Sequence, residues 1–172
     1  GYFIEDIKQY ENDRIIIFEL VGHNELEDLC KKKLICEIMG RYSNLILTDE
    51  NYRIIDSLKH DGVGEYNRTI LPNALYEYPK SDKINPIGLS YQDIENIANE
   101  KKLNTPKDYL NTFLGLSMHI IDNAFINDNI NKNLYDYINS DTLPIIFKNK
   151  KGKPDFYFNP LNEEITKQFD SI

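Results

Sequence analysis

Four apolar runs in the first 60 residues constrain the fold of this 172-residue chain more than any other feature. They are rich in β-branched and aromatic residues and span residues 14–20, 34–39, 44–48 and 52–58. The first run contains consecutive isoleucines, which is typical of a central strand. A four-residue break led by Gly40 separates the second and third runs and predicts a hairpin. We therefore expect these residues to form mostly an antiparallel β meander.

The next stretch, residues 61–88, interrupts this pattern. Its glycines and prolines lie so close together that no long helix or strand can run through it. They are Gly62, Gly64, Pro72, Pro79 and Pro86. The sequence therefore predicts a linker after the β meander.

Helix signals dominate residues 81–142. Ser90 and Thr105 are suited to N-cap positions, because their hydroxyls can accept a hydrogen bond from a backbone N–H in the first helical turn. Pro106 then stands at a favourable first helical position. Apolar spacing predicts a further, short helix over residues 131–138. We expect a helical module here.

A short turn at residues 114–117 joins two of the expected helices. Gly115 can end one helix, and Ser117 can cap the next. Two short helices joined in this way have the shape of a helix-hairpin-helix, whose turn can point backbone N–H groups at a phosphate. The same turn can equally be a joint between packed helices.

From residue 143 the chain becomes extended again. Apolar runs at residues 145–147 and 156–158 flank a lysine-rich stretch, which predicts a closing β-hairpin. Strands followed by helices and again by strands indicate an α+β fold. We expect three parts, which are a β domain over residues 1–80, a helical module over residues 81–142 and a returning hairpin over residues 143–172.

The charge balance limits the partners that the chain can bind. It carries 20 Lys and Arg against 28 Asp and Glu, a formal net charge of −8. Nucleic acid and anionic membranes both favour a basic surface, so any RNA contact must be local. Of the three expected parts, only residues 143–172 carry more basic than acidic side chains. No apolar run approaches the roughly 20 residues that cross a bilayer, so no membrane partner is expected.

Cysteine and histidine spacing offers no metal or catalytic motif. Cys30 and Cys36 lie outside any CxxC pattern and are expected to be reduced thiols in the cytosol, with Cys36 on a buried strand face. His23, His60 and His119 are far apart and match no metal-binding spacing. We expect no metal, no cofactor and no catalytic residue.

A polar cluster precedes the first strong strand. It consists of Asn12, Asp13 and Arg14. The guanidinium can bind a phosphate while the carboxylate holds a neighbouring base or donor. The alternative is a turn aspartate beside an arginine at a strand edge.

The expected hairpin tip carries a second polar cluster. It combines a cation, an aromatic ring and small hydrogen-bonding groups in Arg41, Tyr42, Ser43 and Asn44. These groups suit contact with an RNA backbone or a stacked base. By themselves they also describe an ordinary solvated loop.

Taken together, these stretches resemble the N-terminal region of the NFACT family, which includes RqcH-like and NEMF-like proteins and bacterial proteins labelled fibronectin-binding protein A. Order and spacing agree over residues 12–86, and the Met-Gly-Arg-Tyr-Ser-Asn block at residues 39–44 is the most specific part. The turn at residues 113–117 is similar, more loosely, to the helix-hairpin-helix of the family. The matching stretches are residues 12–16, 34–49, 54–60, 68–72 and 82–86.

The resemblance implies a β domain like the N-terminal domain of formamidopyrimidine-type DNA glycosylases, with further chain before residue 1 and a coiled coil after residue 172. It also implies a non-enzymatic module of a cytoplasmic, bacterial ribosome-associated quality-control factor. The partners would be the 50S subunit with an obstructed nascent chain and tRNA, in bacteria alanyl-tRNA. Peptide transfer in the resulting C-terminal alanine tailing would belong to the ribosome.

Residue roles follow from the same resemblance. Asp13 and Arg14 match the Asp-Arg pair that the family uses for tailing, which implies tRNA binding. Further possible RNA contacts are Arg41, Tyr42, Ser43, Asn44, Lys59, Arg68, Lys150 and Lys151. Two alternatives stay open: a fibronectin-binding adhesin at the cell surface, and a DNA-lesion-binding, glycosylase-like domain that rests on fold analogy alone.

Overall fold

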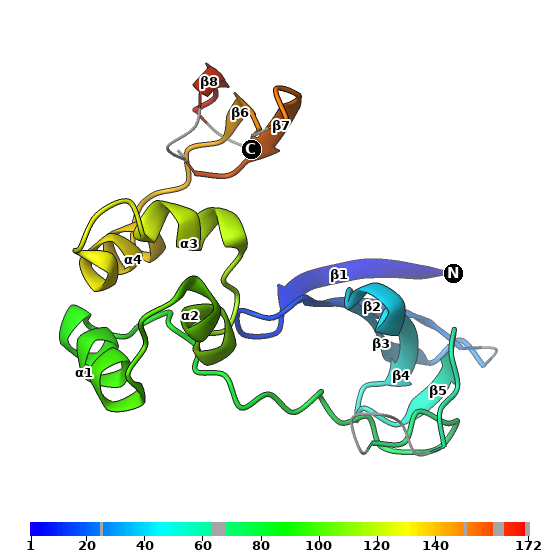
Figure 1. Cartoon of the computed structure of the whole chain (residues 1–172). Helices are drawn as coiled ribbons and strands as arrows, with labels where there is room; N and C mark the ends of the chain where they lie inside the picture. Colours follow the sequence, from blue (N-terminus) through cyan, green and yellow to red (C-terminus); the bar gives the residue numbers. More distant parts are fainter. Residues whose placement is uncertain (25, 63–67, 150, 160–163, 171–172) are drawn as a thin grey trace. The chain divides into compact units, whose positions relative to one another are not determined.

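A computed structural model of the chain describes residues 1–24, 26–62, 68–149, 151–159 and 164–170 (Figure 1). The chain divides into two compact units, Gly1–Asp82 and Lys83–Ile172. Each unit has a hydrophobic core of its own. The first unit is built on a β-sheet, and the second combines helices with a small sheet. The α+β class predicted from the sequence is confirmed.

The first unit contains a five-stranded antiparallel sheet in which each strand pairs with the next along the chain. Its strands are β1 (Tyr2–Gln9), β2 (Ile15–His23), β3 (Leu29–Glu37), β4 (Asn44–Asp49) and β5 (Ile54–Ser57). This order confirms the predicted meander. The structure adds the edge strand β1, all of whose residues are exposed. β3 also begins earlier than the predicted apolar run, because it includes three consecutive lysines that do not fit an apolar pattern.

Alternating side chains bring isoleucines together on one face of this sheet. The strand register places Ile17 beside Ile35, and Ile35 beside Ile46, and all three are buried. Ile70 and Tyr76, from the segment after β5, pack against them. Burial of this apolar surface is the main source of stability for the sheet.

The prediction that Cys36 lies on the buried face is wrong. Its neighbours Ile35 and Glu37 occupy the buried positions of β3, so Cys36 points to the opposite face and is half-buried. That partial burial still raises the pKa of the Cys36 thiol, because a thiolate is poorly solvated there. Cys30 and Cys36 are both free thiols, as expected.

A linker over the whole of residues 61–88 is also wrong, because residues 68–78 pack onto the sheet of the first unit. The Ile54 backbone N–H donates to the Ala74 carbonyl at 2.8 Å, and short bridges fix the rest of the segment. Glycine and proline do exclude long elements here, but isolated backbone bonds are enough to hold the segment in place. Gly64 lies outside the described residues.

The second unit contains the predicted helices. They are α1 (Tyr91–Lys101), α2 (Pro106–Thr112), α3 (Met118–Ala124) and α4 (Ile130–Ile138). Ser90 and Asp93 form a reciprocal capping box at the start of α1, and Thr105 and Asp108 form another at α2. Ser117 caps α3 through its hydroxyl. All three predicted N-caps are confirmed, since each supplies the acceptor that an unpaired helical N–H requires.

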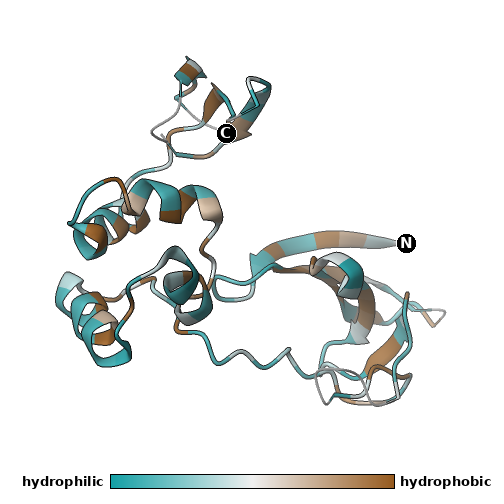
Figure 2. Cartoon of the chain, viewed as in Figure 1, coloured by the Kyte–Doolittle hydropathy of each residue, from teal (hydrophilic) through white to brown (hydrophobic). Residues whose placement is uncertain are grey.

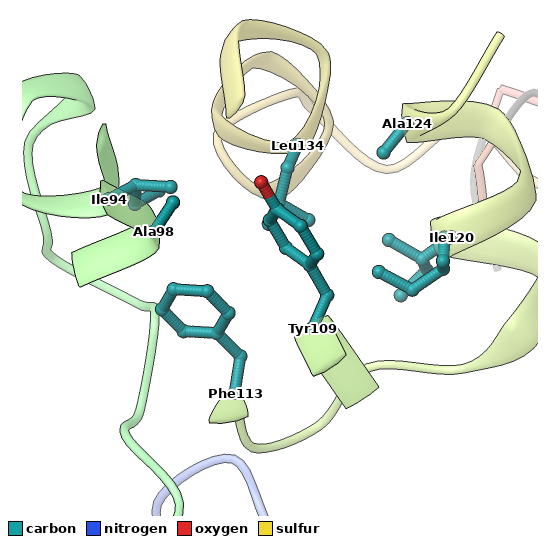
Figure 3. Close-up of a cluster of buried hydrophobic side chains, with 8 residues drawn as sticks. Ile94, Ala98, Tyr109, Phe113, Ile120, Ala124 and Leu134 are labelled. Atoms are coloured by element: carbon teal, nitrogen blue, oxygen red, sulfur yellow. The ribbon is translucent and has the colours of Figure 1, made fainter. Parts of the chain in front are cut away.

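The helices enclose an apolar core. Figure 3 shows Tyr109 of α2 and Phe113, which directly follows α2, projecting into a cluster that includes Ile94, Ala98 and Leu134. The buried Tyr109 hydroxyl donates to Asn131 Oδ1 at 2.6 Å, so it is satisfied. Apolar and hydrophilic residues alternate along each helix (Figure 2), as expected where one face is buried. None of the described helices is long and apolar enough to span a membrane.

A small antiparallel sheet completes the second unit. Its strands are β6 (Ile145–Lys148), β7 (Pro154–Tyr157) and β8 (Glu164–Gln168), in the order β7-β6-β8. The predicted hairpin is confirmed in β6 and β7. The structure adds β8 on the other side of β6, so the chain closes with three strands. Ile145 and Phe147 of β6 are buried under neighbouring aromatic rings.

The N-cap of α1 offers a test of this fold. Ser90→Ala removes the side-chain acceptor for the Asp93 backbone N–H and is expected to lower the free energy of unfolding of the second unit by about 1 kcal/mol. Urea unfolding followed by circular dichroism measures the change. Ser90→Asn keeps an acceptor and should retain the stability. An equal loss in both variants would contradict a capping role.

Candidate nucleic-acid interface

Most of the predicted RNA contacts in the first unit gather at one end of its sheet. Because the strands are antiparallel, the β1–β2 turn, the β3–β4 connection and the chain leaving β5 all lie at this end. The register confirms it, since Ile15 pairs with Glu37, and Glu37 pairs with Asn44. We call residues 10–14, 38–44 and 59 the loop end of the sheet.

Asp13 and Arg14 have different environments at the loop end. The half-buried Asp13 accepts the Arg14 backbone N–H at 2.7 Å through Oδ1, and its carbonyl accepts a bond from Gln9 Nε2 at 2.7 Å. The Arg14 carbonyl accepts the Ile38 N–H at 2.8 Å. The Arg14 side chain is exposed and makes no hydrogen bond or ion pair with any residue that the structure describes. Asp13 therefore shapes the turn, and Arg14 presents a charge to solvent.

The β3–β4 connection is built around the 3₁₀ turn Gly40–Tyr42. The Arg41 guanidinium lies 4.4 Å from the centroid of the Tyr42 ring and also donates to the Tyr42 hydroxyl. Ser43 Oγ accepts the Met39 backbone N–H at 2.9 Å, so this side chain serves the turn itself. Arg41 and Tyr42 together present an exposed cation next to an aromatic face.

Asn44 positions a further cation. Its buried side-chain amide donates to the Lys59 carbonyl and accepts the Lys59 N–H, both at 2.9 Å. These two bonds hold the chain that leaves β5 against the start of β4. The exposed Lys59 Nζ then lies 3.0 Å from the Arg41 carbonyl. Asn44 is thus occupied in holding the backbone, while Lys59 and Arg41 become neighbours.

Glu37 is a site residue that sequence reasoning missed. Its side chain is 1% exposed and forms a two-pronged ion pair with Arg68, with both N···O distances at 2.6 Å. The Tyr76 hydroxyl donates to the same carboxylate at 2.8 Å. The sequence did contain a signal for this site, because Glu37 is the single acid in the apolar run 34–39. A carboxylate at a buried strand position requires partners.

Arg68 is therefore part of the interior of the first unit and does not belong to the loop end with the other predicted RNA contacts of that unit. Its side chain is 8% exposed, and its guanidinium points inward, where Nη1 also donates to the Glu77 carbonyl at 2.8 Å. Although burial disfavours the charge, the hydrogen bonds and charge of Glu37 outweigh it and raise the pKa of Arg68. Burial, followed by the charge of Glu37, raises the pKa of Tyr76 well above its usual range. Arg68 stays protonated, and Tyr76 stays a neutral donor, at neutral pH.

The two remaining predicted contacts belong to the second unit. Lys151 is exposed in the turn between β6 and β7, where its backbone N–H donates to Asn149 Oδ1 at 3.0 Å. Lys150 lies outside the described residues. Within the described ranges there is also no group of three His, Cys, Asp or Glu side chains arranged to hold a metal ion.

The chemistry of the loop end is that of a small binding surface. Arg14 and Arg41 can each fork onto phosphate oxygens, and Lys59 adds a third positive charge. Tyr42 offers a ring on which an unpaired base can stack. Asp13 and Glu11 offset part of this positive charge, so the local net charge is low.

Breaking the buried ion pair should unfold the first unit at lower denaturant concentration. Glu37→Ala leaves the Arg68 charge buried without its partner, and we expect a loss of about 3–5 kcal/mol in the free energy of unfolding, measured by urea titration. The control is Glu5→Ala, which removes the exposed ion pair with Lys31 in the same unit and should cost less than about 1 kcal/mol. Similar small losses in both variants would show that the buried pair is dispensable.

Comparison with known proteins identifies the family. The sequence model described as "NFACT N-terminal and middle domains" matches residues 1–170. The protein "Rqc2 homolog RqcH" of Bacillus subtilis (strain 168) is 43% identical over 122 residues, which cover 68% of this chain and 21% of that protein. Its counterpart in Streptococcus pneumoniae (strain ATCC BAA-255 / R6) is 30% identical over 169 residues, covering 90% and 30%. The chain thus spans less than a third of these relatives.

Solved structures agree with the sequence comparison. The fibrinogen binding protein from Staphylococcus aureus superposes with a TM-score of 0.82 at 32% identity, covering 99% of this chain and 67% of that one. The N-terminal part of the fibronectin/fibrinogen-binding protein from Streptococcus suis gives 0.77 at 31% identity, covering 99% and 64%. Fold, sequence and family model lead to one conclusion: the chain belongs to the NFACT family, by its N-terminal and middle domains.

Proposed function

We propose that this chain is a tRNA- and large-subunit-binding module of a bacterial ribosome-associated quality-control factor, which supports alanine tailing of obstructed nascent chains. Membership in the NFACT family and relatives named RqcH support the proposal. The observation that carries it is Arg14, whose exposed guanidinium has no partner within the described residues and stands at the loop end with Arg41 and Lys59.

The module binds and does no chemistry in this proposal. Asp13 holds the turn through its bond to the Arg14 N–H, so the guanidinium is presented from a fixed backbone. A preorganised cation loses less freedom on binding RNA, and this improves affinity. Peptide transfer belongs to the ribosome, no cofactor takes part, and the factor works in the cytoplasm.

The net charge of −8 shapes how such a module binds RNA. A chain with excess acid repels a polyanion, so binding depends on local groups of cations such as those of the loop end. With three phosphate contacts to single-stranded RNA, the logarithm of the binding constant falls by about 2 for each tenfold rise in salt concentration, and we call this the salt slope. Strongly basic RNA-binding proteins have a much steeper slope. Local contact of this kind favours a defined RNA shape over non-specific coating.

The Asp-Arg pair can be tested in cells. Full-length protein carrying Asp13→Ala or Arg14→Ala should fail to add alanine tails, because the first change loosens the turn and the second removes the cation. Tail length on a stalled reporter is the measurement. Lys31→Ala is the matched control, since it removes an exposed lysine that pairs with Glu5 away from the loop end. Unchanged tails in both test variants would refute the role of the pair.

The neighbouring cations can be tested in vitro. Arg14→Ala in purified full-length protein should weaken tRNA binding about tenfold or more, since a hydrogen bond to a charged group contributes about 1.5–3 kcal/mol. The double variant Arg41→Ala, Lys59→Ala should weaken binding and lower the salt slope by roughly 1–2. Affinity measured over a salt series gives both values. A duplex with an abasic site is the comparison ligand, and equally tight binding to it would favour the glycosylase-like alternative.

A second candidate function is fibronectin binding at the cell surface. It is favoured by the likeness of this chain to two solved structures, a fibrinogen binding protein and a fibronectin/fibrinogen-binding protein. Affinity capture with the full-length protein separates the two functions. Recovery of 50S subunits and tRNA supports quality control, whereas surface exposure with saturable fibronectin binding supports adhesion.

A further inference from the structure

An apolar hollow of about 680 Å³ opens beside the small sheet of the second unit. It is lined by β6, by the end of β7, by His119 of α3 and by Phe169, which follows β8. All of these elements belong to one compact unit, so the hollow does not depend on how the two units are placed.

The rim of the hollow exposes large apolar side chains. Phe156 is 78% exposed and Phe158 is 44% exposed, and both line the hollow. Ile165 of β8 is 40% exposed on the same sheet. Clustered aromatic surface of this kind is unfavourable in water and marks a docking site when it is contiguous.

The lining is suited to apolar side chains. The Tyr157 hydroxyl is hydrogen-bonded to Ser117 Oγ at 2.7 Å, so it is engaged within the unit. The His119 ring is packed against Phe147 and Tyr157, with ring centroids 5.7 and 5.4 Å away. Apart from the His119 imidazole, the lining side chains offer little to a polar ligand, whereas aliphatic or aromatic side chains would gain contact.

The path of the chain indicates where those side chains come from. The Phe169 backbone N–H donates to the Pro144 carbonyl at 2.9 Å, which fixes the outgoing chain to the rim of the hollow. Each further residue can span at most about 3.6 Å, so a few residues suffice to reach across the opening. A segment tethered this closely has an effective concentration in the millimolar range, and modest apolar contact is then enough to hold it.

Relatives of this chain are longer than the part that aligns with it. The aligned part of this chain covers 21–30% of the curated relatives, and 64–67% of two neighbouring solved structures, so members of the family contain much further polypeptide. We propose that the hollow is the docking site of an amphipathic segment of the same polypeptide, which follows residue 172 in the full-length protein and inserts apolar side chains between Phe156, Phe158 and His119.

Hydrogen–deuterium exchange can compare the full-length protein with the 172-residue chain. We expect the backbone amides of β7 to exchange at least tenfold more slowly in the full-length protein, because the docked segment covers them. Phe156→Ser should abolish this protection in the full-length protein. It should change little in the 172-residue chain, where Phe156 already faces solvent.

A matched control separates docking from general destabilisation. Ile126→Ser changes a residue that is 55% exposed in the turn between α3 and α4, outside the lining, and should leave β7 protection intact. Equal exchange of β7 in the two protein lengths would overturn the proposal. Protection of the 172-residue chain that grows with concentration, together with a dimer in light scattering, would overturn it in favour of a second copy of the chain.

Discussion

The buried ion pair between Glu37 and Arg68 is the interaction on which the first unit most depends. A carboxylate at an isoleucine-lined sheet face would be strongly destabilising alone, and here both of its oxygens are paired with the guanidinium. Tyr76 adds a third bond from the same segment. The pair therefore holds residues 68–78 over the sheet, closes the core and fixes the end of β3.

The geometry of the loop end depends on the ion pair between Glu37 and Arg68. Glu37 is the last residue of β3, and the Gly40–Tyr42 turn follows within three residues. On one side of β3 the chain is bonded to Arg14, and on the other side Asn44 begins β4 and anchors Lys59. Exposed cations are thus displayed from a rigid edge, and an acidic protein can still present a local site for an anionic partner.

The second unit is organised by different means. Its helices are short, and reciprocal capping boxes at Ser90 and Thr105 satisfy the N–H groups that tertiary packing leaves unpaired. The small sheet contributes Phe147 to the interior but leaves Phe156 in solvent. The strand register pairs Phe156 with Ile146, on the opposite face from Phe147. An exposed aromatic ring on that face is the physical reason to expect a further segment there.

The sequence by itself determined the elements that rest on local rules. Consecutive β-formers gave the meander, hydroxyl caps gave three helix starts, and the block at residues 39–44 led to the family. Tertiary structure decided what depends on long-range partners. Side chains alternate between the two faces of β3, so Glu37 lies in the core and Cys36 lies on the opposite face. Arg68, which the sequence predicted as an RNA contact, points inward and pairs with Glu37. Periodicity reports local conformation, but the face that a strand buries is decided by what packs against it.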